Sequence, residues 1–176
     1  MRRIVVIGTS GCGKTTLARE LSRSLNIPHI ELDAVHWKPN WVSRPTDEMK
    51  AMLDPLTARE AWTCDGNYSK VRDVVWPRAD TIIWLDYSMT IVFTRCFRRT
   101  IARWWTQTEL WNGNRETLWV NFCTRDSLFL WIVQTWRLQR RDYPKTFQTP
   151  ECRHLRILRF RTPGELERWK RSVGVL

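Results

Sequence analysis

Short apolar runs rich in β-branched residues alternate along the chain with longer segments in which apolar residues recur every three or four positions. The first run, Arg3–Gly8, ends at a glycine, and Leu17, Leu21 and Leu25 then recur four apart within Lys14–Leu25. The run is typical of a buried parallel strand and the recurrence of a helix. The same patterns predict four more strands at His29–Asp33, Ala61–Tyr68, Asp80–Tyr87 and His154–Phe160, and helices beginning near Thr46, Ser69, Thr90, Leu128 and Pro163.

This alternation predicts an α/β fold in which one parallel sheet is wrapped by helices. The 176 residues suit a single domain, which we place at 1–176. The stretch "WWTQTELWNGNRET" is polar, aromatic and contains glycine, so we expect a helical or loop-like lid inserted at about 104–127.

A phosphate-binding motif lies between the first strand and the first helix. Gly8, Gly13, Lys14 and Thr15 satisfy the spacing G-x-x-x-x-G-K-[ST]. The glycines let backbone N–H groups face phosphate oxygens, Lys14 would reach the β- and γ-phosphates, and the Thr15 hydroxyl would reach Mg²⁺. We therefore expect ATP or GTP to be bound. The candidate nucleotide-binding residues are Gly8, Thr9, Ser10, Gly11, Cys12, Gly13, Lys14, Thr15 and Thr16.

Two aspartates are expected at strand ends near this motif. Asp65 ends a strand that could lie beside the first one, where a carboxylate can hold the Mg²⁺ shell together with Thr15; a turn residue before Gly66 is the alternative. Asp33 ends the second predicted strand, at the edge where open α/β sheets bind ligands. It either accepts a hydrogen bond from a substrate or caps the following segment.

Arginines surround the predicted lid. Arg95, Arg99 and Arg103 are spaced four apart and would share one helix face, Arg115 lies in the insert and Arg125 follows it. Phosphoryl transfer needs positive charge near the γ-phosphate and exclusion of water, which such a lid would supply. A solvated surface position is the favoured interpretation of each arginine alone, but for the set as a whole we expect at least two to contact phosphate.

Three further residues and one cysteine are open to two interpretations. Trp37, Trp41 and Arg44 follow Asp33 and could stack a ring and bind its phosphate, or simply pack a loop. Cys12 either fills a variable position of the motif or is a reactive thiol, because a helix N-terminus and Lys14 would lower its pKa.

The charge is uneven along the chain. The formal net charge is +11, yet residues 1–88 hold 12 Lys/Arg against 11 Asp/Glu, and residues 89–176 hold 17 against 7. Such a field favours a polyanionic partner, which could be nucleotide phosphates, nucleic acid or an anionic surface. The five cysteines are far apart and no apolar run is long enough for a membrane span, so we expect a cytoplasmic protein; its oligomeric state is left open.

Several motifs together resemble one known family. They are "GTSGCGKTTLA", the strand ending in Asp33, "DGNYSKVRDVVWPRADTIIWLDY", "LWNGNRE" and "RDSLFLW". The chain resembles the adenylate-kinase-related P-loop family often described as DNA topology modulation proteins. The resemblance implies the nucleoside-monophosphate-kinase fold: a three-layer P-loop fold with a five-stranded parallel sheet of order 2-3-1-4-5 and a lid.

The resemblance also suggests site residues. Adenylate kinases carry D-G-F-P-R after the third strand; here Asp65 and Gly66 match, whereas Asn67, Tyr68 and Ser69 replace the last three residues. Arg72 or Arg78 would then have to supply the missing phosphate-binding arginine, and Arg44 corresponds loosely to another. Arg161–Pro163 lies where related kinases contact adenine. The candidate substrate-binding residues are Asp33, Trp37, Trp41, Arg44, Gly66, Asn67, Tyr68, Arg72 and Arg78.

These observations predict an ATP-binding kinase that transfers a γ-phosphoryl group to a small acceptor, either a nucleoside monophosphate or a hydroxylated metabolite, with ATP and Mg²⁺ as cofactors. The candidate catalytic residues are Lys14, Asp33, Arg95, Arg99, Arg115 and Arg125. The alternatives are a nucleic-acid-associated ATPase or regulator of DNA topology, and a nucleotide-binding switch with little catalysis.

Overall fold

The computed structural model describes residues 1–106, 109–114 and 128–175. Its main sheet has five parallel strands in the order β2-β5-β1-β6-β7. In chain order these are the second, third, first, fourth and fifth main-sheet strands, so the expected order 2-3-1-4-5 is confirmed. The strands are β1 (Arg3–Gly8), β2 (His29–Glu31), β5 (Trp62–Asp65), β6 (Thr81–Leu85) and β7 (Arg156–Phe160).

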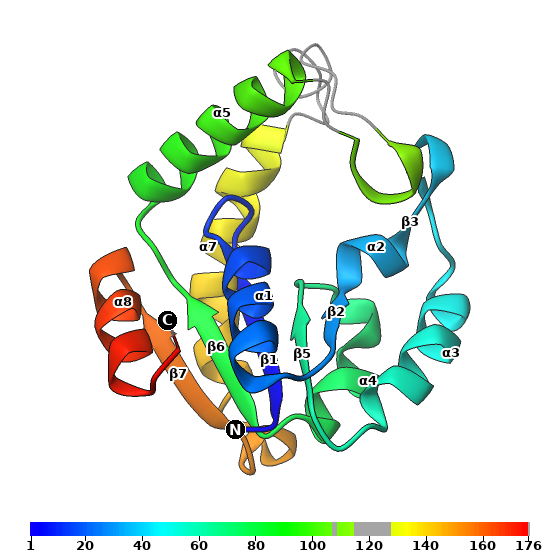
Figure 1. Ribbon diagram of the computed structural model, residues 1–176, viewed down its shortest axis with the longest axis vertical. Coiled ribbons are helices and arrows are strands. Elements are labelled where there is room, and N and C mark those ends of the chain that lie inside the picture. The colour runs from blue at the N-terminus through cyan, green and yellow to red at the C-terminus, as the bar shows by residue number, and fades with distance from the viewer. Residues whose placement is uncertain (107–108, 115–127, 176) are drawn as a thin grey trace.

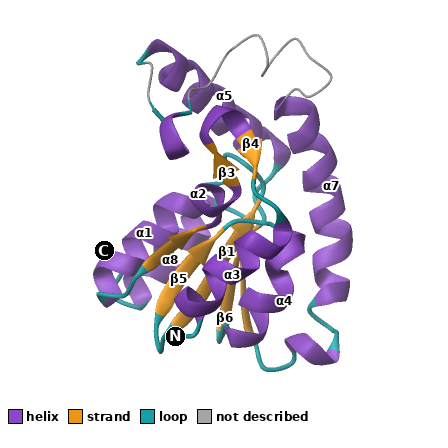
Figure 2. Ribbon diagram, turned by 90° about the vertical axis from the view of Figure 1, so that its right-hand side faces the viewer, coloured by secondary structure: helices purple, strands orange, loops and turns teal. Residues whose placement is uncertain are grey.

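Helices cover both faces of this sheet (Figures 1 and 2). Successive residues of β1 point to opposite faces: Ile4 and Val6 pack with one group of helices, and Val5 and Ile7 with the other. The first group is α1 (Lys14–Leu25), the start of α5 (Met89–Trp105) and α8 (Pro163–Ser172). The second is α3 (Thr46–Thr57), α4 (Arg72–Val75) and the later part of α7 (Leu128–Thr146).

The segment after β2 differs from expectation. The strand stops at Glu31, and Asp33 lies in the first turn of α2 (Leu32–His36). Instead of a plain loop, two short antiparallel strands follow, β3 (Trp37–Lys38) and β4 (Val42–Ser43), joined by the 3₁₀ turn η1 (Pro39–Trp41). In so short a stretch, the order of apolar and polar residues fits both the two-residue period of a strand and the 3.6-residue period of a helix, so the pattern does not distinguish the two.

The predicted insert also begins differently. Trp104 and Trp105 complete α5, which rises beyond the carboxyl end of the sheet beside α7 (Figure 1). Residues 109–114 include the short turn η4 (Trp111–Gly113). The remaining short turns are η2 (Ser69–Val71), η3 (Trp76–Arg78) and η5 (Pro150–Cys152). Across the described ranges, no helix is both long and apolar enough to cross a membrane.

Candidate functional site: a phosphate-binding loop at the carboxyl edge of the sheet

The phosphate-binding loop joins the end of β1 to the start of α1. Gly8 has φ 144°, and a Cβ there would lie 2.6 Å from the carbonyl oxygen of Leu85, so only glycine fits. Gly13, with φ 99°, precedes the first turn of α1. The loop therefore leads directly into a helix N-terminus, where backbone N–H groups and the helix dipole favour an anion.

The loop is closed by short contacts of its own. Cys12 N donates to Thr9 O at 3.2 Å, and Lys14 Nζ donates to the same oxygen at 3.3 Å. Thr9 Oγ1 donates to Gln139 Oε1 of α7 at 3.2 Å. Lys14 thus lies folded over the loop, and α7 supports the loop from the side.

Cys12 is buried beneath the loop, with 1% of its surface exposed. A Cβ on Gly8 would lie 2.8 Å from its sulfur, so the thiol fills the space under that glycine. Burial raises the pKa of the thiol, and the opposing effect of Lys14 is smaller. The hypothesis of a reactive, low-pKa Cys12 is therefore wrong, because desolvation outweighs the nearby positive charge.

Thr15 and Asp65 meet beside the loop. Thr15 Oγ1 donates to Asp65 Oδ2 at 2.6 Å, which follows from β5 lying next to β1 in the sheet. The other carboxylate oxygen, Oδ1, accepts a hydrogen bond from His29 Nε2 at 2.7 Å. No sequence motif points to His29, whose contact with Asp65 follows only from the pairing of β2 with β5.

Asn67 holds the start of the loop. Its Oδ1 accepts from Gly8 N at 3.1 Å, and its Nδ2 donates to Gly8 O. One side-chain amide therefore binds both backbone groups of Gly8, as a neighbouring strand would. The carboxamide of Asn67 thus positions the phosphate-binding loop, and its expected contact with substrate stays a prediction.

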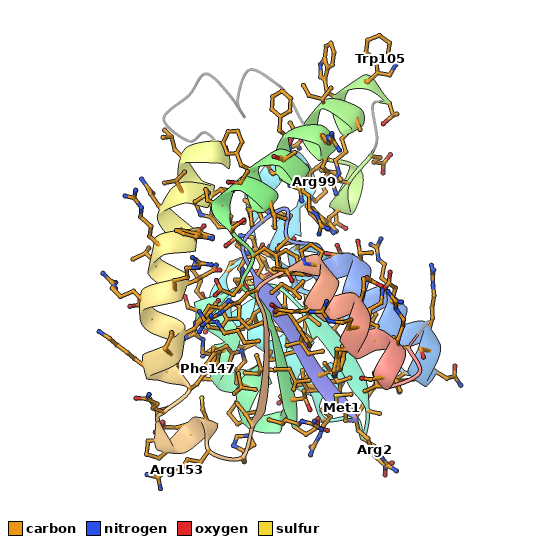
Figure 3. All side chains as sticks on the ribbon, turned by 90° about the vertical axis from the view of Figure 1, so that its left-hand side faces the viewer. Met1, Arg2, Arg99, Trp105, Phe147 and Arg153 are labelled. Carbon is orange, nitrogen blue, oxygen red and sulfur yellow. The ribbon has the colours of Figure 1, made fainter. Side chains whose placement is uncertain are left out.

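Two arginines of α5 converge on the loop. Arg95 Nη1 donates to Cys12 O at 3.4 Å, and Arg99 Nη2 donates to Ser10 Oγ at 3.2 Å. Figure 3 shows Arg99 on α5. Within the described part of the chain, the buried Nε of Arg99 has no hydrogen-bond partner. The third member of the stripe, Arg103, lies in the last turn of α5, and Arg115 and Arg125 lie outside the described residues.

Asp33 and Tyr68 form a pair on the β2 side of the site. Tyr68 Oη donates to Asp33 Oδ1 at 2.6 Å. Burial, followed by the neighbouring Asp33 charge, raises the pKa of Tyr68 far above its usual range, so its hydroxyl stays protonated. The second oxygen of Asp33 has no hydrogen bond from the described residues. It can accept one from a substrate hydroxyl, although Asp33 is presented by α2 and not by a strand end.

The Trp111–Asn114 segment of the predicted lid packs on the β3–β4 hairpin. Trp111 Nε1 donates to Glu31 Oε1 at 2.8 Å, and Asn112 Nδ2 donates to Trp37 O. Asn114 Oδ1 accepts from Trp41 N at 2.8 Å, and its Nδ2 donates to Lys38 O at 3.0 Å. The rings of Trp37, Trp41 and Trp111 meet edge to face in turn. Trp37 and Trp41 thus pack on each other, and Trp41 also packs on Trp111; that they stack a ligand ring stays a prediction.

The three arginines considered for the acceptor phosphate lie in different places. Arg44 donates to Val35 O at 2.8 Å and pairs with Glu48, so it supports the hairpin. Arg72 stacks on Trp76 at 4.4 Å, near Gly66 and Asn67. Arg78 precedes β6 at the opposite, amino-terminal edge of the sheet, where it binds Asp54 and Thr57. The structure therefore does not bring Arg78 to the site.

Arg161–Pro163 lies at the carboxyl end of β7, on the same edge as the phosphate-binding loop. Arg161 N donates to Glu165 Oε2 at 2.7 Å, and Thr162 Oγ1 accepts from Glu165 N at 3.2 Å, which caps α8. The expected adenine contact stays a prediction.

Asp86 was absent from the sequence-based candidates. It directly follows β6, is buried, and binds Arg140 at 2.6 Å through one oxygen and Arg159 at 2.6 Å through the other. Each guanidinium also stacks on a tryptophan, Arg140 on Trp136 and Arg159 on Trp84. This cluster ties α7 and β7 to β6 next to the site.

Fold and site together define a P-loop domain, with one parallel sheet and a phosphate-binding loop at its carboxyl edge. A family model described as an AAA domain matches residues 4–115, well over half of the chain, so the chain belongs to that family. No curated protein matches the chain.

Several solved structures share the fold. Shikimate kinase from Bacteroides thetaiotaomicron is 15% identical, with a TM-score of 0.58 and 98% coverage of each chain. Shikimate kinase from Acinetobacter baumannii, in complex with shikimate, is 12% identical, with a TM-score of 0.61 and coverage of 99% of this chain and 94% of that one. A gluconokinase from Sinorhizobium meliloti 1021 is 18% identical, with a TM-score of 0.54 and coverage of 99% and 91%. At these identities the likeness shows the fold alone.

Proposed function

We propose that the protein is an ATP-dependent kinase that transfers the γ-phosphoryl group to a small acceptor. The observation that carries this proposal is the convergence of Arg95 and Arg99 on the phosphate-binding loop. A site that only binds nucleotide needs the loop, whereas transfer also needs positive charge where the transferred group gains negative charge. Lys14, Arg95 and Arg99 supply that charge in this chain.

The residues present fit a Mg²⁺ ion. The Thr15 hydroxyl and the Asp65 carboxylate are oxygen donors of the kind that Mg²⁺ prefers, and they already lie within hydrogen-bonding distance. Thr15 would hold the ion directly and Asp65 through water. When bound, Mg²⁺ would neutralise charge on the β- and γ-phosphates.

The acceptor is proposed to bind on the side of Asp33 and Tyr68. The Tyr68 hydroxyl fixes one oxygen of Asp33, which leaves the other to accept a hydrogen bond from the attacking hydroxyl. Two of the similar structures are named as kinases of shikimate and gluconate, both hydroxylated carboxylic acids. This favours a hydroxylated metabolite over a nucleoside monophosphate as acceptor.

The direct test is Lys14→Ala, with Lys145→Ala as the control because Lys145 is an exposed lysine outside the site. Lys14→Ala should abolish ATP turnover but retain the circular dichroism spectrum of the folded protein. Lys145→Ala should retain both the turnover and the spectrum of the wild type. Unchanged turnover in purified Lys14→Ala protein would refute the proposal.

A nucleic-acid-associated ATPase, such as a regulator of DNA topology, is the second candidate, and the charge of the second half favours it. Part of that charge is used internally, since Arg140 and Arg159 bind Asp86, and Lys170 binds Glu20 and Glu167. A DNA-binding protein should lose affinity with salt at a slope of about −0.9 per phosphate contacted. A kinase of small acceptors should turn over ATP independently of DNA.

A further inference from the structure

We propose that His29 is a positioning residue that holds the Asp65 carboxylate in the orientation needed for the metal ion of the nucleotide. This inference rests on the proposed function, because it concerns the Mg²⁺ of bound ATP. Nothing in the phosphate-binding motif itself points to a histidine on another strand.

The first argument is that Asp65 is held from two sides. His29 Nε2 lies 2.7 Å from Oδ1, and Thr15 Oγ1 lies 2.6 Å from Oδ2. A carboxylate only accepts hydrogen bonds, so Nε2 carries the hydrogen and donates it. With Asp65 at 1% exposure, few water molecules can replace either donor. The two bonds together fix the plane of the carboxylate.

The second argument is that the register of β2 against β5 brings His29, Thr63 and Asp65 to one face of the sheet. In the parallel pairing of β2 with β5, His29 lies opposite Thr63, and Asp65 is two residues further along β5. Residues two apart on a strand share a face, so all three side chains point to the same side. That side is covered by α1, since Thr63 Oγ1 donates to Ala18 O and Asp65 binds Thr15. A donor at position 29 is therefore aimed at Asp65 by backbone register.

The third argument concerns what the His29 bond adds. Removing it would let the carboxylate turn about its Cβ–Cγ bond, because Thr15 alone holds a single oxygen. Residues that hydrogen-bond direct metal ligands commonly change metal affinity about 10- to 100-fold when removed. Because Asp65 would hold the ion through water, His29 lies one step further from the metal, and we expect a loss at the lower end of that range. Nucleotide binding without metal depends on the loop backbone and Lys14, which His29 does not contact in the described structure.

The test uses Mn²⁺ as a spectroscopic substitute for Mg²⁺, with a non-hydrolysable ATP analogue. Electron paramagnetic resonance gives the affinity of Mn²⁺ for the protein–nucleotide complex, and calorimetry in EDTA gives nucleotide affinity without metal. His29→Ala should weaken Mn²⁺ binding about 10-fold and leave metal-free nucleotide binding unchanged. His29→Gln, whose amide N–H can donate in place of Nε2, should recover most of the loss. His154→Ala removes an exposed histidine elsewhere and serves as the control.

The outcomes separate the two claims. If wild-type protein binds Mn²⁺ with the nucleotide and His29→Ala does so equally well, the inference is wrong while the proposed function stands. An equal loss in His29→Ala and His29→Gln also overturns it, because hydrogen-bond donation would then not be the cause. If wild-type protein binds no nucleotide, the proposed function fails and the inference falls with it. Should His29→Ala fail to fold, His29→Leu, which fills the space without a donor, takes its place.

Discussion

Asn67 offers the most quantitative test of how the phosphate-binding loop is held. Asn67→Ala removes both hydrogen bonds to Gly8 and leaves a buried backbone N–H and C=O without their partners. Each such group costs about 1–3 kcal/mol, which brackets the loss at about 2–6 kcal/mol. Because the Asn67 side chain is only half-buried, water can partly replace it, and we expect a loss at the lower end, about 2 kcal/mol.

This loss converts into measurable shifts. For a chain of this size, about 2 kcal/mol lowers Tm by about 4–8 °C. If the loop of the variant becomes ordered only when nucleotide binds, the binding free energy must supply the same amount, about 2 kcal/mol. ATP affinity then falls by at most about 30-fold. Urea and thermal unfolding followed by circular dichroism give the first number, and calorimetry gives the second. Gln148→Ala, which removes an exposed amide elsewhere, should change neither. A Tm for Asn67→Ala equal to that of wild type would refute the claim that this amide holds the loop.

Three further perturbations test other parts of the site. Cys12 should react slowly with iodoacetamide whether or not Mg-ATP is present, because it is buried and its pKa is raised; rapid labelling that ATP suppresses would contradict this. Burial, with a smaller effect of Lys70, lowers the pKa of His36 below its usual value of 6.5. As the pH falls, His36 is therefore protonated in the unfolded chain before it is protonated in the folded protein. The free energy of unfolding should then fall as pH drops below about 6.5, and His36→Asn should flatten that slope; identical slopes in wild type and variant would exclude the effect. Asn114→Ala removes the hydrogen bonds to Trp41 N and Lys38 O, and should raise KM for the acceptor while ATP binding stays unchanged. An unchanged KM would show that the Trp111–Asn114 segment does not contribute to acceptor binding.

The fold was largely predictable because its signals are local. β1 and β6 consist largely of buried apolar residues that are mostly β-branched or aromatic, and α1 shows a clear four-residue recurrence. The phosphate-binding motif fixes its own context, with a strand before it and a helix after it. The adjacency of Thr15 and Asp65 also followed, because it needs only that β5 lie beside β1.

The parts that were missed depend on long-range packing. The role of His29 requires the register of β2 against β5, and that of Asn67 requires the distance from β5 to the loop. Whether Cys12 faces phosphate or core depends on the packing of the loop over Leu85 and Cys96, which no local pattern encodes. The predicted position of Asp33 at a strand end is wrong because the short segment after β2 fits the periods of helix and strand equally well. Arg78 does not reach the site because it pairs with Asp54 of α3, a contact that no local pattern encodes.

The central claim is that ATP is consumed by transfer to a small acceptor. The most direct measurement is ADP release by the wild-type protein with Mg²⁺, across a panel of hydroxylated acids, sugars and nucleoside monophosphates, each with and without DNA. The account predicts ADP release that requires one acceptor class, yields its phosphorylated product in equal amount, and is indifferent to DNA. ADP release that needs DNA and no acceptor, or tight ATP binding without turnover against any acceptor, would contradict it.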